Sequence, residues 1–216
     1  MNTTTNQQLI DSLNWRYATK QFDATRNISP EDWETLEEAL RLSPSSLGLQ
    51  PWKFLVINDP ELRAKLQPVS YGQSQIVDAS HLVVFATKLN LGEADIDAHI
   101  AKIAEVRGVS VEDLAPLRAM SVGGVVAGKT EEQRREWAFN QTYIALGNLL
   151  TSAALLEIDA CPMEGFSRDE YDRILGLTEQ GLGSAVVATL GYRSADDKYG
   201  SAPKVRFDRD EVIQHL

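Results

Sequence analysis

Apolar residues recur along the chain at two different spacings, which together predict a mixture of helices and strands. A spacing of three to four residues is typical of amphipathic helices, whereas short uninterrupted apolar runs are typical of buried strands. The pattern predicts helices over residues 9–16, 30–43, 61–66, 131–158 and 168–175, and two helical pieces between 92 and 117. It predicts buried strands over residues 53–57, 81–87 and 184–192.

Capping residues mark where several of these helices begin and end. Thr5 and Ser29 can each accept a hydrogen bond from the first turn of the helix that follows. Ser167 and Glu170 form a capping-box pattern, and Gly176 suits the end of the same helix. These residues predict three helix starts and one helix end.

The longest helical pattern, 131–158, changes character along its length. Its first half is amphipathic, and its second half is apolar nearly all round apart from interruptions such as Asn148 and Glu157. The apolar part falls short of the roughly 20 residues that span a bilayer, so we expect a helix buried in a core or against another subunit. The apolar side chains of residues 212–216 predict a docked C-terminal tail.

Composition narrows the class of protein. Of 216 residues, 43% are hydrophobic and 24% are charged, and no repeat or linker divides them, so one globular domain over residues 1–216 is expected. The net charge of -10 disfavours nucleic-acid and membrane partners. No basic and apolar stretch resembling a secretory signal opens the sequence, which favours a cytoplasmic protein. A single cysteine and three scattered histidines predict no metal site.

Four cations of this acidic chain lie in two tight pairs. Arg16 lies near Lys20, and Lys204 lies near Arg206. Arginine offers a planar fork and lysine a point charge, so two such pairs that converge in the fold would suit a phosphate monoester. The alternative interpretation is ordinary scattered surface charge.

Two loops have a composition that suits ligand binding. Residues 43–52 are rich in hydroxyl and turn residues, whose groups could bind a heteroaromatic cofactor or could simply connect a helix to a strand. In residues 162–166, Gly165 would let the backbone approach a planar ligand, although a plain turn explains the same sequence. Glu164 has no nearby carboxylate or histidine to support a role as general acid or base.

A phosphate-loop pattern, G-x-x-x-x-G-K-[ST], is matched by Gly123, Gly128, Lys129 and Thr130. Such a loop binds phosphate only where a buried strand leads into a helix N-terminus, and residues 118–122 are a poor strand. We therefore interpret the match as accidental and keep nucleotide binding as an alternative. The sequence contains neither a G-x-S-x-G elbow nor a G-x-G-x-x-G turn after a strand, and no residue is assigned a catalytic role.

Five short motifs, taken in order and spacing, resemble the nitroreductase family. They are residues 16–22 (RYATKQF), 43–46 with 50–52 (SPSS and QPW), 78–81 (DASH), 164–166 (EGF) and 204–206 (KVR). Each motif is weak alone, but together they extend along nearly the whole chain. The resemblance implies an α+β, three-layer fold with a central, mainly antiparallel sheet flanked by helices, in an intertwined homodimer.

The resemblance also implies FMN bound at the subunit interface. The residues implied as cofactor-binding are Arg16, Tyr17, Ala18, Lys20, Pro44, Ser45, Ser46, Gln73, Gln75, Met163, Glu164, Gly165, Lys204 and Arg206. The basic residues would hold the phosphate, with Lys20 reaching the flavin ring as the alternative. Residues 44–46 would come from the partner subunit. Residues 163–165 would line the isoalloxazine with a main-chain amide facing N5, and either Gln73 or Gln75 would approach the ring edge.

By the same resemblance, the expected activity is transfer of electrons from NADH or NADPH to nitroaromatics, quinones or similar small-molecule acceptors. The chemistry would belong mainly to the flavin, in a ping-pong cycle. A quinone or free-flavin reductase, or a specialised flavin enzyme such as a dehalogenase, would reuse the same contacts and remains an alternative.

Overall fold

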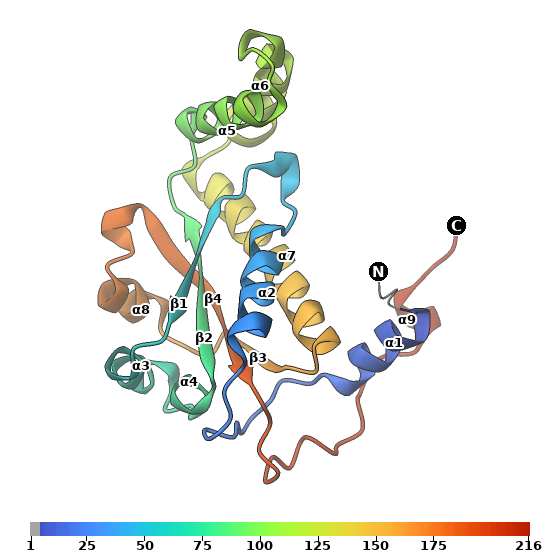
Figure 1. The fold of residues 1–216 in the computed structure, drawn as a ribbon. Coiled ribbons are helices and arrows are strands. Elements are labelled where there is room, and N and C mark those ends of the chain that lie inside the picture. The colour runs from blue at the N-terminus through green and yellow to red at the C-terminus, as the bar shows by residue number, and fades with distance from the viewer. Residues whose placement is uncertain (1–4) are drawn as a thin grey trace.

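A four-stranded antiparallel sheet lies at the centre of the computed structural model, which describes residues 5–216 (Figure 1). Its strands are β1 (Trp52–Ile57), β2 (His81–Lys88), β3 (Asp159–Met163) and β4 (Leu182–Gly191), in the order β1-β2-β4-β3. All three pairings are antiparallel. The expected α+β class with an antiparallel central sheet is confirmed.

Helices cover both faces of this sheet. The α-helices of residues 5–216 are α1 (Asn6–Trp15), α2 (Pro30–Arg41), α3 (Pro60–Leu66), α4 (Gln75–Asp78), α5 (Glu93–Arg107), α6 (Ala115–Ser121), α7 (Glu131–Leu155), α8 (Arg168–Leu175) and α9 (Arg209–Val212), of which five cover the sheet. On one face α2 and α7 pack against the sheet, and on the other lie α3, α4 and α8 (Figure 1). Among residues 5–216, no helix is both long and apolar enough to cross a membrane.

The two inner strands are buried on both sides, which explains their uninterrupted apolar sequences. On β2, Val83 and Phe85 pack into the core beneath α2 and α7, whereas Leu82 and Val84 pack into the core beneath α3, α4 and α8. Successive side chains of a strand point to opposite faces, so a strand between two helical layers needs apolar residues at every position. Every residue of β4 is buried for the same reason.

A helical arm formed by α5, α6 and a π-helical turn (Val122–Val126) extends from one end of the sheet (Figure 1). Gly123 lies in this turn and follows a helix, so no strand delivers the glycines to a phosphate. Thr130 instead caps α7 by accepting a hydrogen bond from the Gln133 amide. The phosphate-loop match is accidental, as its sequence context predicted.

The long helix ends earlier than its sequence predicts, and a strand follows that the pattern missed. Helix α7 ends at Leu155, Glu157 takes a left-handed conformation with φ 56°, and β3 begins at Asp159. The turn interrupts the helical hydrogen bonds, and pairing with β4 then extends residues 159–163. The helical prediction over 156–158 is therefore wrong, because the apolar spacing of Leu155, Leu156 and Ile158 continues past the turn at which the backbone leaves the helix.

Three smaller predictions also need correction. Helix α8 begins where expected, but the Ser167 side chain accepts no capping hydrogen bond, so the capping box is wrong. Strand β4 begins at Leu182, two residues before the predicted start. The C-terminal tail is not docked on its own chain, since Val212, Ile213 and Leu216 are all exposed.

The left-handed turn at Glu157 yields a test of stability. A residue with a Cβ atom pays roughly 1–2 kcal/mol for this conformation, and glycine does not. We expect Glu157→Gly to raise the free energy of unfolding by about 0.5–1 kcal/mol in urea denaturation. The matched control, Glu136→Gly in the exposed middle of α7, should lower it by about 1 kcal/mol. An equal loss of unfolding free energy in both variants would contradict a left-handed conformation at Glu157.

Candidate functional site

The two basic pairs of the sequence meet in one cavity. Arg16, Lys20, Lys204 and Arg206 all line a depression of about 430 Å³, together with Tyr17 and Ala18. The chain following α1 forms one wall, and the segment preceding α9 forms the other; these segments lie side by side in Figure 1. Folding thus brings together residues that are separated by almost the whole sequence.

The charges of this cavity are not neutralised by the protein. Within residues 5–216, none of the four cations forms an ion pair with a carboxylate. Burial and the charge of Arg206 lower the pKa of Arg16, and burial together with Arg16 and Arg206 lowers the pKa of Lys204. Mutual repulsion of cations in an acidic chain is typical of a site that binds an anion.

One carboxylate, that of Asp197, joins the two walls. Its Oδ2 atom accepts hydrogen bonds from the backbone N–H groups of Lys20 (2.7 Å) and Gln21 (3.0 Å) and from the Tyr17 hydroxyl (2.9 Å). Its Oδ1 atom accepts from the Tyr199 N–H at 3.0 Å. Burial opposes ionisation, but these backbone donors hold the pKa of Asp197 below its usual range. Burial and Asp197 in turn raise the pKa of Tyr17 to about 12.

A buried ion pair connects the cavity to strand β3. Arg193 Nη2 lies 2.6 Å from Asp159 Oδ1, and the Arg193 guanidinium stacks over the rings of Trp15 and Tyr17. Asp159 also accepts the backbone N–H of Arg193 at 2.8 Å. A parallel bridge between Ala18 and Ala160 continues this contact along the strand. The cationic cavity therefore lies beside the first residues of β3.

The edge of β3 extends from this cavity toward the other predicted cofactor residues. Cys161 is buried, and burial raises the pKa of its thiol, although the charges of Lys20 and Arg16 and the side chain of Gln75 act in the opposite direction. Gln75 is thus placed beside Cys161, in the middle of the strand. Since β3 pairs with β4 on one side only, its outer edge is open over residues 161–163.

Beyond β3, residues 164 and 165 are held between two side chains. The Tyr143 hydroxyl donates to Glu164 Oε1 at 2.6 Å, and Gln73 Nε2 donates to the Gly165 carbonyl at 2.8 Å. Within residues 5–216, neither the Glu164 nor the Gly165 N–H donates a hydrogen bond to a protein acceptor. The segment thus offers fixed, unused donors at the far end of the β3 edge.

The loop over residues 44–46, which the family resemblance implies as a cofactor contact from the partner subunit, lies away from this cavity. Pro44, Ser45 and Ser46 do not line the cationic cavity, and Figure 1 shows their loop near the helical arm, away from α1 and α9. The Ser46 N–H donates to Gln141 of α7, and Leu47 and Gln50 adopt left-handed backbone conformations with φ 58° and 43°. Such strain in residues other than glycine is common at functional loops.

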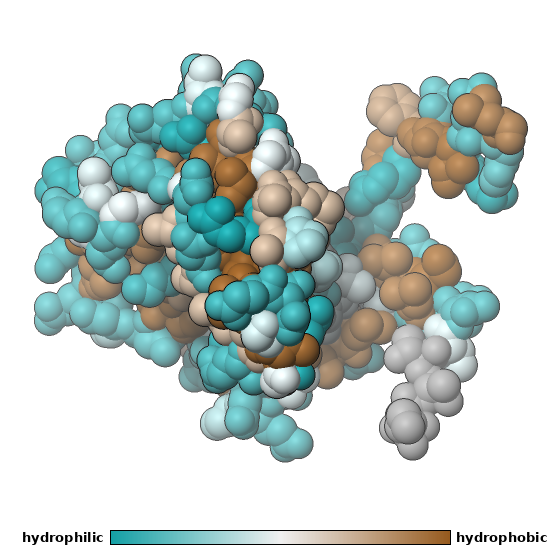
Figure 2. All heavy atoms as spheres, turned by 90° about the horizontal axis from the view of Figure 1, so that it is seen from above, coloured by the Kyte–Doolittle hydropathy of each residue, from teal (hydrophilic) through white to brown (hydrophobic). Residues whose placement is uncertain are grey.

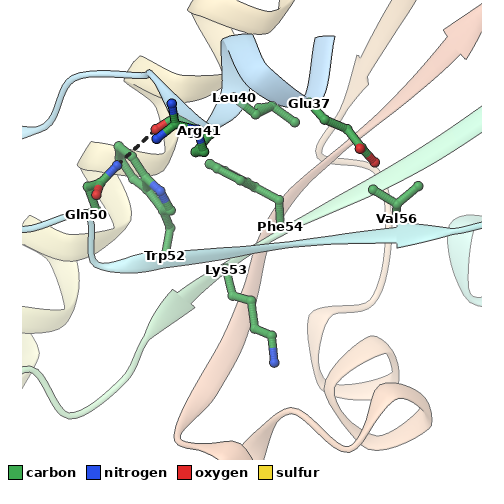
Figure 3. A pocket seen from close by; sticks show the side chains of 8 residues that line it. All are labelled: Glu37, Leu40, Arg41, Gln50, Trp52, Lys53, Phe54 and Val56. Atoms are coloured by element: carbon green, nitrogen blue, oxygen red, sulfur yellow. Dashed lines mark hydrogen bonds between the residues drawn. The ribbon is translucent and has the colours of Figure 1, made fainter. Parts of the chain in front are cut away.

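A second cavity, of about 410 Å³, lies between α2 and β1 at the opposite edge of the sheet. Trp52, Phe54 and Val56 point toward α2, while Lys53 points to the other face of the strand (Figure 3). Its walls are aromatic and aliphatic, with Glu37 and Arg41 at the side of the helix. The cluster of uncompensated cations is not part of it, so it is a different kind of site.

Comparison with known proteins identifies the family of this chain. The profile of the nitroreductase family matches residues 13–192. The chain belongs to this family of oxidoreductases. Candidate NAD(P)H nitroreductases of Staphylococcus epidermidis and Bacillus subtilis are 41% and 37% identical to it, with 98% and 96% of each chain covered.

Solved structures show the same fold. A candidate nitroreductase from Bacillus subtilis superposes with a TM-score of 0.83 at 20% identity, covering 98% of this chain and 100% of the other. A candidate nitroreductase from Exiguobacterium sibiricum, solved in complex with FMN, gives 0.78 at 19% identity, with 100% and 99% covered. Because these identities are below 25%, the likeness shows a shared fold and does not show a shared ligand.

Sequence reasoning did not single out Asp197, Asp159 or Tyr143. Asp197 lies in a turn-rich stretch where acidic residues are common, and Asp159 comes directly after the predicted long helix, outside any predicted strand. Tyr143 resembled one more apolar core position. Nothing in the local sequence distinguishes them, since each acts through a partner distant in the chain.

Replacement of Asp197 tests the organisation of the cavity. We expect Asp197→Asn to lower the free energy of unfolding by about 2 kcal/mol at pH 7, because an amide cannot accept all four donors. The folded pKa is depressed, so this contribution is present above the unfolded value of about 4 and is lost as the pH falls through the lower folded value. Urea unfolding near pH 7 and near pH 3 measures the difference.

The adjacent Asp196→Asn variant is the control, because the Asp196 side chain forms no hydrogen bond among the described residues. Its stability should equal that of the wild-type protein at both pH values. A loss for Asp197→Asn that did not shrink at low pH would contradict a role for the charged carboxylate.

Proposed function

We propose that this protein binds FMN along the outer edge of β3 and transfers electrons from NAD(P)H to nitroaromatics, quinones or related acceptors in a ping-pong cycle. One observation carries the proposal: uncompensated cations lie at one end of an open strand edge, and unused backbone donors lie at the other. An elongated ligand with a phosphate at one end and a planar ring with acceptor atoms at the other fits this arrangement. The NAD(P)H nitroreductase relatives and the FMN-bound structural relative support it.

Different residues would bind the two ends of FMN. Arg16, Lys204 and Arg206 would neutralise the phosphate, since a phosphate monoester carries about two negative charges near neutral pH. Residues 163–165 would face the ring and offer their main-chain amides to its acceptor atoms. When bound, FMN would supply the hydride and electron chemistry, and the protein would supply orientation and charge.

We also propose that the functional unit is a homodimer. Two segments extend from the body of the chain and carry exposed apolar side chains, seen as brown atoms on the projecting parts of Figure 2. These side chains are Leu9, Ile10, Leu13 and Trp15 in α1, and Val205, Phe207, Val212, Ile213 and Leu216 near the C-terminus. Exposed apolar surface on protruding segments is typical of subunit contacts. A second copy would also supply residues 44–46, which lie outside the cavity of their own chain.

Flavin titration tests the proposed cofactor site. The protein with FMN added should show oxidised-flavin absorbance that bleaches anaerobically with NADH or NADPH and returns with a nitroaromatic or quinone. We expect Arg206→Gln to weaken FMN binding about 10- to 100-fold, because a charge-assisted contact to phosphate is lost. Riboflavin lacks the phosphate, so its dissociation constant should change by less than about threefold in the same variant.

Arg209→Gln, on α9 and outside the cavity, is the matched control and should bind FMN as the wild-type protein does. Absence of FMN binding to the wild-type protein would refute the proposed function. Equal weakening of FMN and riboflavin in Arg206→Gln would refute the assignment of the phosphate end.

Truncation tests the dimer. A chain that ends at Asp208 keeps Lys204 and Arg206 but loses α9 and the exposed apolar side chains of Val212, Ile213 and Leu216. Burial of even one such side chain is worth more than 1 kcal/mol, so the dimer dissociation constant should rise by about tenfold or more. Light scattering over a dilution series measures this. A wild-type protein that is monomeric at micromolar concentration would contradict the dimer.

A further inference from the structure

The short segment after β3 is held more firmly than an exposed loop requires. Glu164 is exposed, yet its carboxylate is bound by a hydroxyl from α7, and the next carbonyl is bound by an amide from the segment before α4. The Phe166 N–H also closes a tight turn onto the Glu164 carbonyl at 2.9 Å. Two distant parts of the chain therefore hold the Glu164 side chain and the Gly165 carbonyl.

Tyr143 supplies the first contact. Its hydroxyl lies 2.6 Å from Glu164 Oε1, and burial together with this carboxylate raises the pKa of Tyr143 to about 12. The phenol therefore stays protonated near neutral pH and remains a donor to the carboxylate. One turn earlier on α7, the centre of the Phe139 ring lies 5.2 Å from that of the Tyr143 ring. The Arg168 guanidinium lies over the Phe139 ring, 4.7 Å from its centre. These contacts limit movement of the Tyr143 ring.

Gln73 supplies the second contact. Its Nε2 atom donates to the carbonyls of Ser70 (3.0 Å) and Gly165 (2.8 Å), so the amide nitrogen is fully used by the protein. A Cβ atom on residue 165 would lie 3.2 Å from this nitrogen, which explains glycine at that position. Gln73 thus binds the last carbonyl of the segment that was expected to line the flavin, and its Nε2 atom is not free for the ring.

We propose that Tyr143 is a positioning residue that acts through Glu164 to set the relative affinity of the protein for oxidised and reduced FMN. The inference rests on the proposed function. Tyr143 holds the Glu164 carboxylate beside the segment that faces the ring, while Gln73 holds the neighbouring carbonyl. A negative charge fixed near the ring disfavours the electron-rich reduced form. A main-chain amide directed at N5 has the same effect, because N5 accepts a hydrogen bond only when it is oxidised.

Removal of the Tyr143 hydroxyl should therefore favour reduced FMN. In Tyr143→Phe the exposed Glu164 carboxylate is free to turn into solvent, and the segment of residues 164–165 keeps only the Gln73 contact of the two. We expect the ratio of dissociation constants for the oxidised and reduced forms to change by about tenfold in favour of the reduced form. For a two-electron couple this corresponds to an upward shift of about 30 mV in the midpoint potential.

The experiment compares midpoint potentials and FMN dissociation constants of four variants with those of the wild-type holoenzyme. They are Tyr143→Phe, Glu164→Gln, the double variant and Tyr192→Phe. Glu164→Gln removes the charge but keeps an acceptor for the Tyr143 hydroxyl, so most of the Tyr143→Phe shift should vanish in its background. Tyr192→Phe is the matched control, because its half-buried hydroxyl forms no hydrogen bond among residues 5–216, and its potential should stay at the wild-type value.

Two results would overturn the inference while leaving FMN binding intact: a Tyr143→Phe potential equal to that of the wild type, or a shift that persists undiminished beside Glu164→Gln. If Tyr143→Phe binds too little FMN for a potential to be measured, Gln73→Met tests the second contact and should shift the potential in the same direction. No shift there would also overturn the inference. Failure of the wild-type protein to bind FMN is a separate outcome, which refutes the proposed function itself.

Discussion

The carboxylate of Asp197 is the constraint on which the cationic cavity depends. It accepts two backbone N–H groups from one wall and a third from its own turn, in addition to a tyrosine hydroxyl. Because it binds the backbone of Lys20 and not its ammonium group, it fixes the wall without neutralising the charge. An acidic residue can thus assemble a site for an anion, provided that its hydrogen bonds are taken by neutral donors.

Strand β3 is an edge strand of the sheet, and only a short part of its outer edge is left unpaired. Open edges of sheets tend to pair with other chains, and proteins restrict them with proline, short length or covering segments. Here Ala18 covers the first part of β3, Pro162 presents no N–H at the middle, and residues 164–165 leave the strand as a fixed turn. What remains available is a short row of donors and acceptors, bounded at one end by cations and at the other by the Tyr143 and Gln73 contacts.

The sequence predicted those elements whose signals are local. Thr5 and Ser29 cap the helices that follow them, and the apolar run of β2 forms a strand buried on both faces, as their patterns indicate. Strand β3 was missed because its five residues include a proline and are extended by pairing with β4, more than twenty residues away. Convergence of the basic pairs followed from the family resemblance and not from their spacing, and the cofactor role of residues 44–46, which lie outside the cavity, stays a prediction.

The positive cavity belongs to a chain whose net charge is -10. A phosphate that approaches from solution first meets the field of the whole surface, which repels it, and meets the attraction of Arg16, Lys204 and Arg206 only at short range. Dissolved salt screens the long-range repulsion more completely than contacts inside a partly buried cavity. For the anionic ligand proposed to bind here, ionic strength would therefore have opposite effects on the two stages of capture: it would speed the diffusional encounter and shorten the time that the ligand stays bound.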